Sequence, residues 1–427
     1  MIRLMATVSF VGLGLAAWDA PLEAQEQPIT IGASLPLTGN FSVSGQKHKE
    51  GYELCVDKIN EAGGLLERSV ELIVSDNRSD VGTAMNQYER LINAENVDLL
   101  FGTFSSKLTF PTTSVTEQYD MVHPIPAGGA LRIYTRGHDK IFYFQASAAE
   151  YTGATLRNVI EDLVPEGEGP TKAAIVHADD FFANAIAAGL LGQKVTSPGG
   201  EDVADLSPGY LQELKIEPAM IETWPEEGFS DWLNLANSIR RANVDIVIAL
   251  TASAEEAVQL TRALQTLKVQ PKLVYMSQGT QAEYYEGVGD AGTGVLVHSV
   301  WHADAPFEGV LGGETYTNQD FIDDYQERYG YMPDEDAAIP FAVCQGIEQA
   351  VRGAGTTDNV ELANWLHART EDEPVQTILG RYNWDERGLP EGKSHLMTQW
   401  QGDQLTFVYP TDEFEGTAPM IYPKPEW

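Results

Sequence analysis

The chain has 427 residues, with 63 aspartates and glutamates against 27 lysines and arginines. A chain of this length exceeds what one hydrophobic core usually organises, so two domains are expected. The net charge of −36 disfavours nucleic-acid binding, because phosphates would be repelled rather than neutralised. The acids are scattered along the chain, which agrees with the charged, solvating surface of a protein from a saline habitat.

Residues 1–24 have the pattern of a secretory signal peptide. Arg3 is the only early charge, residues 4–17 form an apolar core, and residues 22–24 (LEA) offer a cleavage site. An uncleaved membrane anchor is the alternative, although the apolar run is short for a bilayer span. We expect the signal peptide to be removed and the mature protein to be soluble.

The first elements after the signal predict a βαβ unit. Residues 29–35 are an apolar run typical of a buried strand, and the turn residues 36–39 (PLTG) end it. Residues 46–60 carry apolar side chains close to helical spacing. Residues 62–64 (AGG) end that helix, since glycine tolerates the left-handed conformation. Residues 69–75 form the second strand, and ligands gather at the carboxyl ends of such strands.

Strand and helix signals alternate along the rest of the chain. Further strands are expected at residues 97–101, 121–125, 141–145, 172–177, 219–223, 245–250, 273–276 and 294–300. Further helices are expected at residues 84–94, 153–163, 183–191, 255–267, 321–329 and 337–353. This alternation of strands and helices occurs in two separate series along the chain, so we expect an α/β protein with two doubly wound parallel-sheet lobes.

Several motifs in a fixed order resemble one family, the periplasmic solute-binding proteins of branched-chain amino acid type (Leu/Ile/Val-binding) ABC transporters. These motifs are P-L-T-G after the first strand, I-N-x-A-G-G after the first helix, V-E-L-I-V-x-D in the second strand, V-D-L-L-F-G-T-F-S-S at 97–106 and P-D-E-D-A-A near residue 340. The resemblance extends over nearly all of the mature chain. It implies a type I periplasmic-binding fold, whose chain crosses three times between two lobes.

The resemblance also implies how the chain divides. Lobe one would contain residues 29–148 and 291–372, and lobe two would contain residues 149–290 and 373–412. Residues 413–427 would form a C-terminal tail on the surface.

The two cysteines, Cys55 and Cys344, leave two possibilities open. An exported chain can form a disulfide, and these two could pair if their helices are neighbours. Both lie on apolar faces of predicted helices, so two buried free thiols are at least as consistent. The resemblance places both cysteines in one lobe, on its first and last helices.

Motifs for catalysis and cofactor binding are missing from the sequence. There is no phosphate-binding P-loop, no Gly-x-Gly-x-x-Gly after a strand, no His-Glu-x-x-His and no Gly-x-Ser-x-Gly. His298 and His302 would lie about 13 Å apart on a strand, too far for one metal ion. His177 with Asp179 and Asp180 could suggest acid–base chemistry, but polar strand ends at a domain cleft are commoner. We expect no metal, no cofactor and no enzymatic activity.

The ligand-binding residues are implied by the resemblance, position by position. Ser106 best matches the family's serine on the ligand carboxylate, and small donors with free backbone N–H groups at a strand end suit an anion. Ala127 keeps a small residue, whereas Gly129 replaces a hydroxyl and would leave room for a bulkier ligand. The full expected set is Phe41, Ser105, Ser106, Ala127, Gly128, Gly129, Tyr151, Phe182, Gln278, Gly279 and Trp301.

One position departs from the family. Amino-acid binders carry an acid after the strand that matches 273–276, and this chain has Gly279 there. Burying a ligand ammonium without a counter-charge would cost several kcal/mol. Trp301 and Tyr284 could instead stack on a ring or cap an apolar group. The pattern therefore favours an aromatic or other non-amino carboxylate over a branched-chain or other amino acid.

Three classes of function remain. The first is a monomeric periplasmic receptor that binds a small molecule and transiently contacts an ABC permease in the inner membrane. The second is a ligand sensor on the same fold. The third, a secreted hydrolase, requires a catalytic pair of carboxylates in the cleft.

Overall fold

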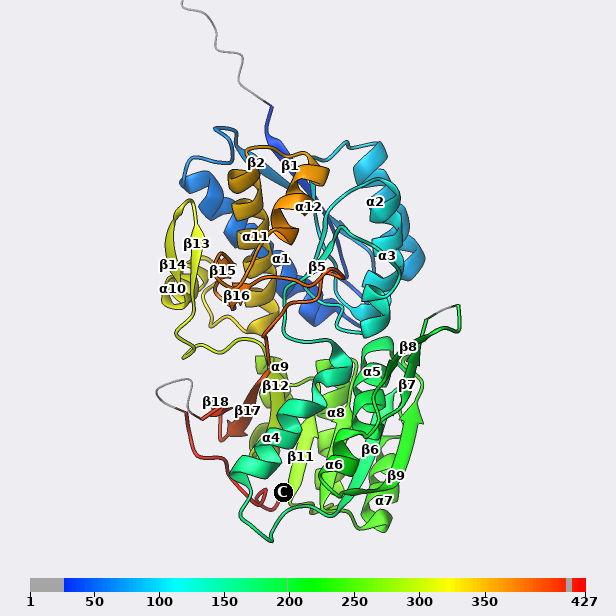
Figure 1. Cartoon of the computed structure of the whole chain (residues 1–427). Helices are drawn as coiled ribbons and strands as arrows, with labels where there is room; N and C mark the ends of the chain where they lie inside the picture. The colour runs from blue at the N-terminus through cyan, green and yellow to red at the C-terminus, as the bar shows by residue number, and fades with distance from the viewer. Residues whose placement is uncertain (1–26, 198, 412–416) are drawn as a thin grey trace, which may run out of the picture.

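The computed structural model describes residues 27–197, 199–411 and 417–427, and the expected signal peptide lies outside these residues. Two α/β lobes lie one above the other in Figure 1, and the described chain begins at the upper lobe and ends at the lower lobe. Within the described residues, no helix has both the length and the apolar character to cross a bilayer.

Lobe one is built on short parallel strands. β1 (Ile29–Leu35) lies between β2 (Val70–Asp76) and β3 (Leu99–Phe101), and β4 (His123–Ile125) pairs with β5 (Ile141–Tyr143). Its helices are α1 (Ser42–Glu61), α2 (Val81–Asn93), α3 (Ser106–Gln118), the 3₁₀ turn η1 (Leu131–Tyr134), α10 (Asn318–Tyr329), α11 (Glu335–Ala354) and α12 (Asn359–His367). Two hairpins join this lobe, β13 (Glu308–Leu311) with β14 (Glu314–Thr317) and β15 (Val375–Thr377) with β16 (Gly380–Tyr382).

Lobe two is built on one seven-stranded sheet in the order β18-β17-β12-β11-β10-β6-β9. Its strands are β6 (Lys172–Ala178), β9 (Glu217–Trp224), β10 (Ile246–Leu250), β11 (Leu273–Met276), β12 (Val295–Ser299), β17 (Leu396–Gln401) and β18 (Gln404–Tyr409). Five strands are parallel, whereas β17 and β18 run antiparallel to their neighbours, so the sheet is mixed at one edge.

The helices of lobe two cover both faces of its sheet (Figure 1). They are the turn η2 (Ala149–Tyr151) at the crossover, α4 (Gly153–Leu163), α5 (Phe181–Leu191), α6 (Tyr210–Glu213), α7 (Trp232–Ala242), α8 (Ala254–Thr266), α9 (Ala282–Val288) and the turn η3 (Gly289–Gly292). A small hairpin, β7 (Lys194–Thr196) with β8 (Asp202–Asp205), projects beside α5.

The chain crosses between the lobes three times, after β5, after β12 and between β16 and β17. Two of the expected boundaries are displaced. β12 was expected in lobe one, but its buried residues Val295 and Leu296 pair with β11 in the sheet of lobe two. β15 and β16 were expected in lobe two, but Val375 and Tyr382 are buried in the apolar core of lobe one.

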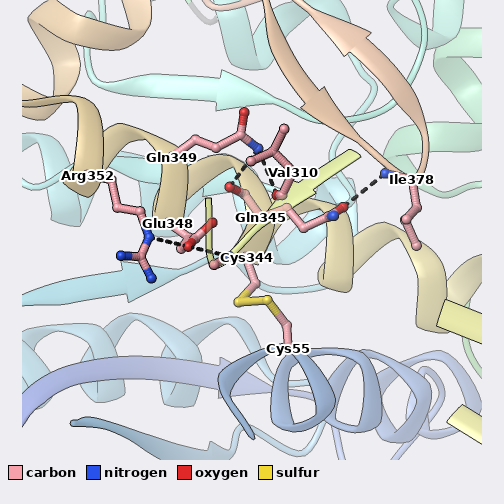
Figure 2. The surroundings of a disulfide bond; sticks show 9 residues. Cys55, Val310, Cys344, Gln345, Glu348, Gln349, Arg352 and Ile378 are labelled. Atoms are coloured by element: carbon pink, nitrogen blue, oxygen red, sulfur yellow. Dashed lines mark hydrogen bonds and ion pairs between the residues drawn. A yellow bond between two sulfur atoms is a disulfide. The ribbon is translucent and has the colours of Figure 1, made fainter. Parts of the chain in front are cut away.

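Cys55 on α1 and Cys344 on α11 form a disulfide with a Cα–Cα distance of 6.2 Å, so the alternative of free thiols is wrong. Figure 2 shows the bond between the two helices, with Glu348 and Arg352 paired one turn further along α11. The helices approach closely because residue 51 is glycine: a Cβ atom there would lie 2.2 Å from the carbonyl oxygen of Ala337.

The C-terminal residues 417–427 lie against lobe two. Gln399 Nε2 donates to the Ile421 carbonyl at 3.0 Å, and the Lys424 N–H donates to the Lys272 carbonyl at 2.8 Å. The expectation of a tail on the surface stays a prediction for residues 413–416, which lie outside the described part.

Candidate ligand-binding site

A cavity lies between the two lobes, at the carboxyl ends of the strands. Its empty volume is about 610 Å³, including space open to solvent. Lobe one contributes Phe104, Ser105, Ser106, Ala127, Gly128, Gly129, Tyr143, Gln145, Glu335, Asp336 and Ile339. Lobe two and its crossover contribute Asp180, Phe182, Ala252, Ser277, Gln278, His298 and Val300. Seven of the eleven residues expected from the sequence therefore line one cavity: Ser105, Ser106, Ala127, Gly128, Gly129, Phe182 and Gln278.

The strongest anion-binding feature is the start of α3. Ser105 is the N-cap residue and Ser106 is the first helical residue, and both side chains are buried. Neither hydroxyl has a hydrogen-bond partner among the described residues. No acidic residue lies in the first helical turn, so the partial positive charge of the helix N-terminus is not neutralised there. Hydroxyl donors at a helix N-terminus have the chemistry that suits a carboxylate.

The loop of Ala127, Gly128 and Gly129 is held rigidly beside α3, because hydrogen bonds engage all three carbonyls. Ala127 accepts from Thr109 at 2.7 Å, Gly128 from Tyr134 at 2.7 Å, and Gly129 from the Ala149 N–H at 2.7 Å.

Gly129 was expected to leave room for a bulkier ligand, and two side chains lie close to this position. A Cβ atom at residue 129 would lie 2.9 Å from the Tyr143 hydroxyl and 3.3 Å from the ring of Phe182. A side chain at residue 129 would therefore require the Tyr143 hydroxyl to move. The room left for a ligand beside Gly129 stays a prediction.

Phe182 reaches the cavity from lobe two because Asp180 fixes the start of α5. Asp180 Oδ1 accepts from the N–H groups of Phe182 at 2.8 Å and Ala183 at 3.1 Å, a side-chain N-cap. The ring of Phe182 lies 6.3 Å from that of His298. Burial lowers the pKa of His298 to about 4, so its imidazole is neutral near pH 7.

Glu335 is a cavity residue that the sequence analysis missed. It is the first residue of α11, and it joins the lobes by accepting from Thr280 at 2.7 Å, Ser299 at 2.6 Å and the Val300 N–H at 3.0 Å. Burial, and then the charge of Asp336, raises its pKa to about 7. The motif P-D-E-D at 333–336 contains this residue, but in the sequence it indicated only the family resemblance and not a place in the cavity.

Two further carboxyl groups line the cavity, and both were missed. Asp336 accepts from Ser44 at 2.8 Å and from Gln281 at 2.9 Å, and burial raises its pKa. Burial also raises the pKa of Asp180, whose Oδ2 atom has no partner among the described residues. In the cavity, the carboxyl groups of Glu335 and Asp336 therefore accept hydrogen bonds from neighbouring side chains, whereas Asp180 has one oxygen that accepts none.

Two expected aromatic contacts lie elsewhere. Trp301 is buried in the core of lobe one, where its Nε1 donates to Asn318 at 2.6 Å. Tyr284 is fully buried and shares a 2.9 Å hydrogen bond with Thr261. Neither ring is available to stack on a ligand in the cavity.

Three more expected residues lie outside the cavity. Phe41 packs on Phe104, with ring centroids 5.6 Å apart, and forms the second layer of the wall. Tyr151 is exposed on the crossover turn. Gly279 lies behind the cavity, where its carbonyl accepts from Trp400 at 2.8 Å.

Among the residues that the structure describes, no group of three or more His, Cys, Asp or Glu side chains is placed to hold a metal ion. Hydroxyl, carboxyl, amide and imidazole groups line the cavity together with apolar side chains.

Comparisons with known proteins agree with this architecture. The sequence profile of a family described as periplasmic binding protein matches residues 28–403. Leu/Ile/Val-binding protein homolog 1 of Brucella abortus (strain 2308) is 23% identical over 397 residues, which cover 93% of this chain and 97% of that protein.

Two solved structures share the fold. The branched-chain amino acid transporter substrate binding protein LivJ of Streptococcus pneumoniae, in complex with isoleucine, has a TM-score of 0.73 at 17% identity, covering 89% of this chain and 98% of that one. A solute binding protein of an ABC transporter from R. palustris, in complex with benzoate, has a TM-score of 0.71 at 19% identity, covering 92% and 98%. The chain therefore belongs to the periplasmic binding protein family, with its type I fold, and is a binding protein rather than an enzyme.

Proposed function

We propose that this protein is the periplasmic receptor of an ABC importer, which closes its lobes on a small organic acid and presents the closed form to a membrane permease. The observation that carries the proposal is the pair of buried, unpartnered hydroxyls of Ser105 and Ser106 at the N-terminus of α3, inside a cavity between the lobes. Those donors suit the carboxylate of the ligand.

The rest of the cavity suits an apolar body. Phe104, Phe182 and Ile339 line it together with the small residues Ala127 and Ala252. A few placed polar groups within apolar walls are the usual arrangement of a ligand cleft. An aromatic or other apolar acid fits this division, and a structural neighbour of this chain was solved with benzoate.

We further propose that the ligand lacks an α-amino group. Gly279 provides no counter-charge, and the carboxyl groups of Glu335 and Asp336 already accept hydrogen bonds from the protein. Burial raises the pKa of each cavity carboxyl, which favours the neutral form and lets a ligand carboxylate enter. The alternative ligand is an amino acid whose ammonium pairs with Asp180 Oδ2.

Isothermal titration of phenylpyruvate and phenylalanine tests this proposal. We expect phenylpyruvate to bind more tightly, and Ser106→Ala to lose roughly 1–3 kcal/mol of its binding free energy, because a charged acceptor is left short of a donor. Ser69→Ala, an exposed serine before β2, is the control and should bind as wild type. Tight binding of phenylalanine that Asp180→Asn abolishes would establish the amino-acid alternative.

Export and partners are part of the same proposal. Residues 1–24 would direct the chain to the periplasm, where it would act as a monomer. N-terminal sequencing of the mature protein checks the cleavage. Transport of the bound ligand into vesicles that contain the cognate permease separates an importer from a sensor on the same fold.

A further inference from the structure

A second pocket lies beside the first crossover, on the other side of the start of α5 from the ligand cavity, and it shares no residue with that cavity. Its empty volume is about 570 Å³, including space open to solvent. Arg132 enters it from η1 in lobe one and Glu150 from η2, while Phe181, Asn184 and Lys194 enter from α5 and β7 in lobe two. We call it the side pocket.

Arg132 is unusual among the arginines of this chain. Its side chain is half-buried, yet within residues 27–197, 199–411 and 417–427 its guanidinium donates no hydrogen bond and forms no ion pair, and its Nε atom is buried without an acceptor. Every other described arginine that is not exposed has a hydrogen-bonded or charged partner, for example Arg136 with Ser114 at 2.7 Å. A guanidinium has five N–H donors. Those of Arg132 are unpaired although the chain has a net charge of −36, so they are available to an anion from solution.

The neighbours of Arg132 leave its donors free. Glu150 lines the same pocket, where burial raises its pKa and the charge of Arg132 partly offsets that effect. The Glu150 Oε2 nevertheless accepts from the Leu131 N–H at 2.9 Å, and the two side chains form no ion pair among the described contacts. Lys194 is already paired with Asp202 at 3.2 Å. The guanidinium carbon lies 5.6 Å from the centre of the Phe181 ring, which forms an apolar wall beside it.

We propose that the side pocket binds a small carboxylate anion, with the Arg132 guanidinium as its donor fork and the Phe181 ring packed against its apolar part. A planar guanidinium presents two parallel N–H donors that match the two oxygens of a carboxylate. The small side chains of Ala185 and Ala188 leave room along α5 for a short aliphatic group. This proposal does not depend on which ligand the cavity binds.

The position of the side pocket has a consequence for closure. Its walls come from both lobes and from the crossover between them, so a bound anion adds contacts that exist only for one arrangement of the lobes. An anion there and a ligand in the cavity therefore influence each other's affinity by the same factor.

The test uses sodium butyrate as the probe, at constant ionic strength, with butyramide as its uncharged counterpart. The readouts are the ¹⁵Nε–Hε NMR resonance of Arg132 and the thermal stability of the full mature chain. We expect a saturable shift of the Arg132 resonance with butyrate and none with butyramide. Arg132→Gln should weaken the stabilising effect of butyrate at least tenfold, and Arg132→Lys, which keeps the charge without the fork, should weaken it less.

Two variants make the outcome specific. Arg78→Gln removes an exposed arginine whose side chain also forms no hydrogen bond or ion pair among the described residues, and it should respond to butyrate as wild type. Ser106→Ala damages the cavity and should leave the side pocket unchanged, so failure here is distinct from failure of the proposed function. The proposal is overturned if Ser106→Ala abolishes the butyrate effect, if butyramide or inorganic phosphate acts where butyrate does not, or if Arg132→Gln binds butyrate unchanged.

Discussion

Single residues in the cavity decide what charge it accepts, and Glu335 is the one that bridges the lobes. Its Oε1 accepts from Thr280, and its Oε2 accepts from Ser299 and the Val300 N–H. The carboxyl group is therefore well supplied with donors, but burial still raises its pKa to about 7. Ionising Glu335 therefore costs more free energy in the folded protein than in the unfolded chain.

This shift gives a prediction for stability against pH. Because the folded pKa of Glu335 is raised, its contribution to stability is complete below the unfolded pKa near 4.5 and is lost as the pH rises to about 7. Glu335→Gln should flatten the fall in unfolding free energy over that range, measured by urea denaturation. The amide oxygen of the glutamine introduced at position 335 can still accept from Ser299 and Val300, and its amide NH₂ group can donate to Thr280.

Glu89→Gln, an exposed change on α2, is the control and should keep the wild-type slope. A slope in Glu335→Gln equal to that of wild type would show that Glu335 keeps an ordinary pKa in the folded protein.

The seven expected residues in the cavity were predictable because loops at the carboxyl ends of parallel strands converge on one edge. Trp301 was not, because β12 ends at Ser299 and the chain bends at Val300. Val300 still lines the cavity, while the indole of Trp301 donates to Asn318 and lies in the apolar core of lobe one. A difference of one residue separates a ligand contact from a core residue, and an aromatic side chain alone does not reveal which it is.

At the scale of elements, the helix most important for the site, α3, was not predicted. Its sequence SKLTFPTTSVTEQ contains Pro111 and several threonines, which disfavour helix on propensity. Thr112 donates to the Leu108 carbonyl and Thr113 to the Thr109 carbonyl within the helix, each at 2.9 Å. Thr109 donates to the Ala127 carbonyl of the neighbouring loop at 2.7 Å. Tertiary packing thus overrides local propensity in this segment.

The start of α11 shows a related error. The apolar spacing predicted a helix from residue 337, but α11 begins at Glu335 because Asp334 caps it, accepting from the Ala337 N–H. Periodicity reports where a helix becomes buried, and capping decides where it begins. The two residues between those points are the cavity acids Glu335 and Asp336.

The disulfide between α1 and α11 gives the prediction at this scale. The double change Cys55→Ala and Cys344→Ala should lower the unfolding free energy by roughly 2–4 kcal/mol, because the bond restricts the unfolded chain. Neither cysteine lines the cavity, so ligand affinity should remain that of wild type. Guanidinium chloride denaturation of both proteins, followed by titration, measures the two quantities. Loss of affinity with stability unchanged would contradict this division of roles.

At the scale of the whole molecule, the two lobes were predictable from the repeated βα rhythm, but the allocation of later segments was not. β12 and β15 are short strands whose local sequences suit either lobe. Their places follow from partners far away in sequence: Met397 and Thr398 on β17 for β12, and Gln349 on α11 for β15. Such pairings depend on the assembled fold and leave no local pattern.

Ion pairs across the mouth of the cleft hold the two lobes together. Lys107 on α3 lies 2.9 Å from Glu226 and 3.4 Å from Glu227, which follow β9 in lobe two. Lys107 directly follows the cavity residue Ser106, so one helical turn contributes both to the anion site and to this interlobe contact. Opening the lobes separates Lys107 from both acids, while the fold of each lobe is untouched.

Lys107→Ala should therefore weaken binding of a cavity ligand without lowering the unfolding free energy of either lobe. Partly exposed ion pairs contribute about 0.2–1 kcal/mol each, so losing both pairs should weaken binding roughly two- to thirtyfold at low salt. Screening should shrink that loss as salt rises. Lys49→Ala, whose pair with Glu53 at 2.9 Å lies within α1, is the matched control. In small-angle scattering without ligand, Lys107→Glu should shift the protein toward a more open form, and adding Glu226→Lys and Glu227→Lys should reverse the shift. Equal affinities of Lys107→Ala and Lys49→Ala at low salt would show that these pairs do not favour closure.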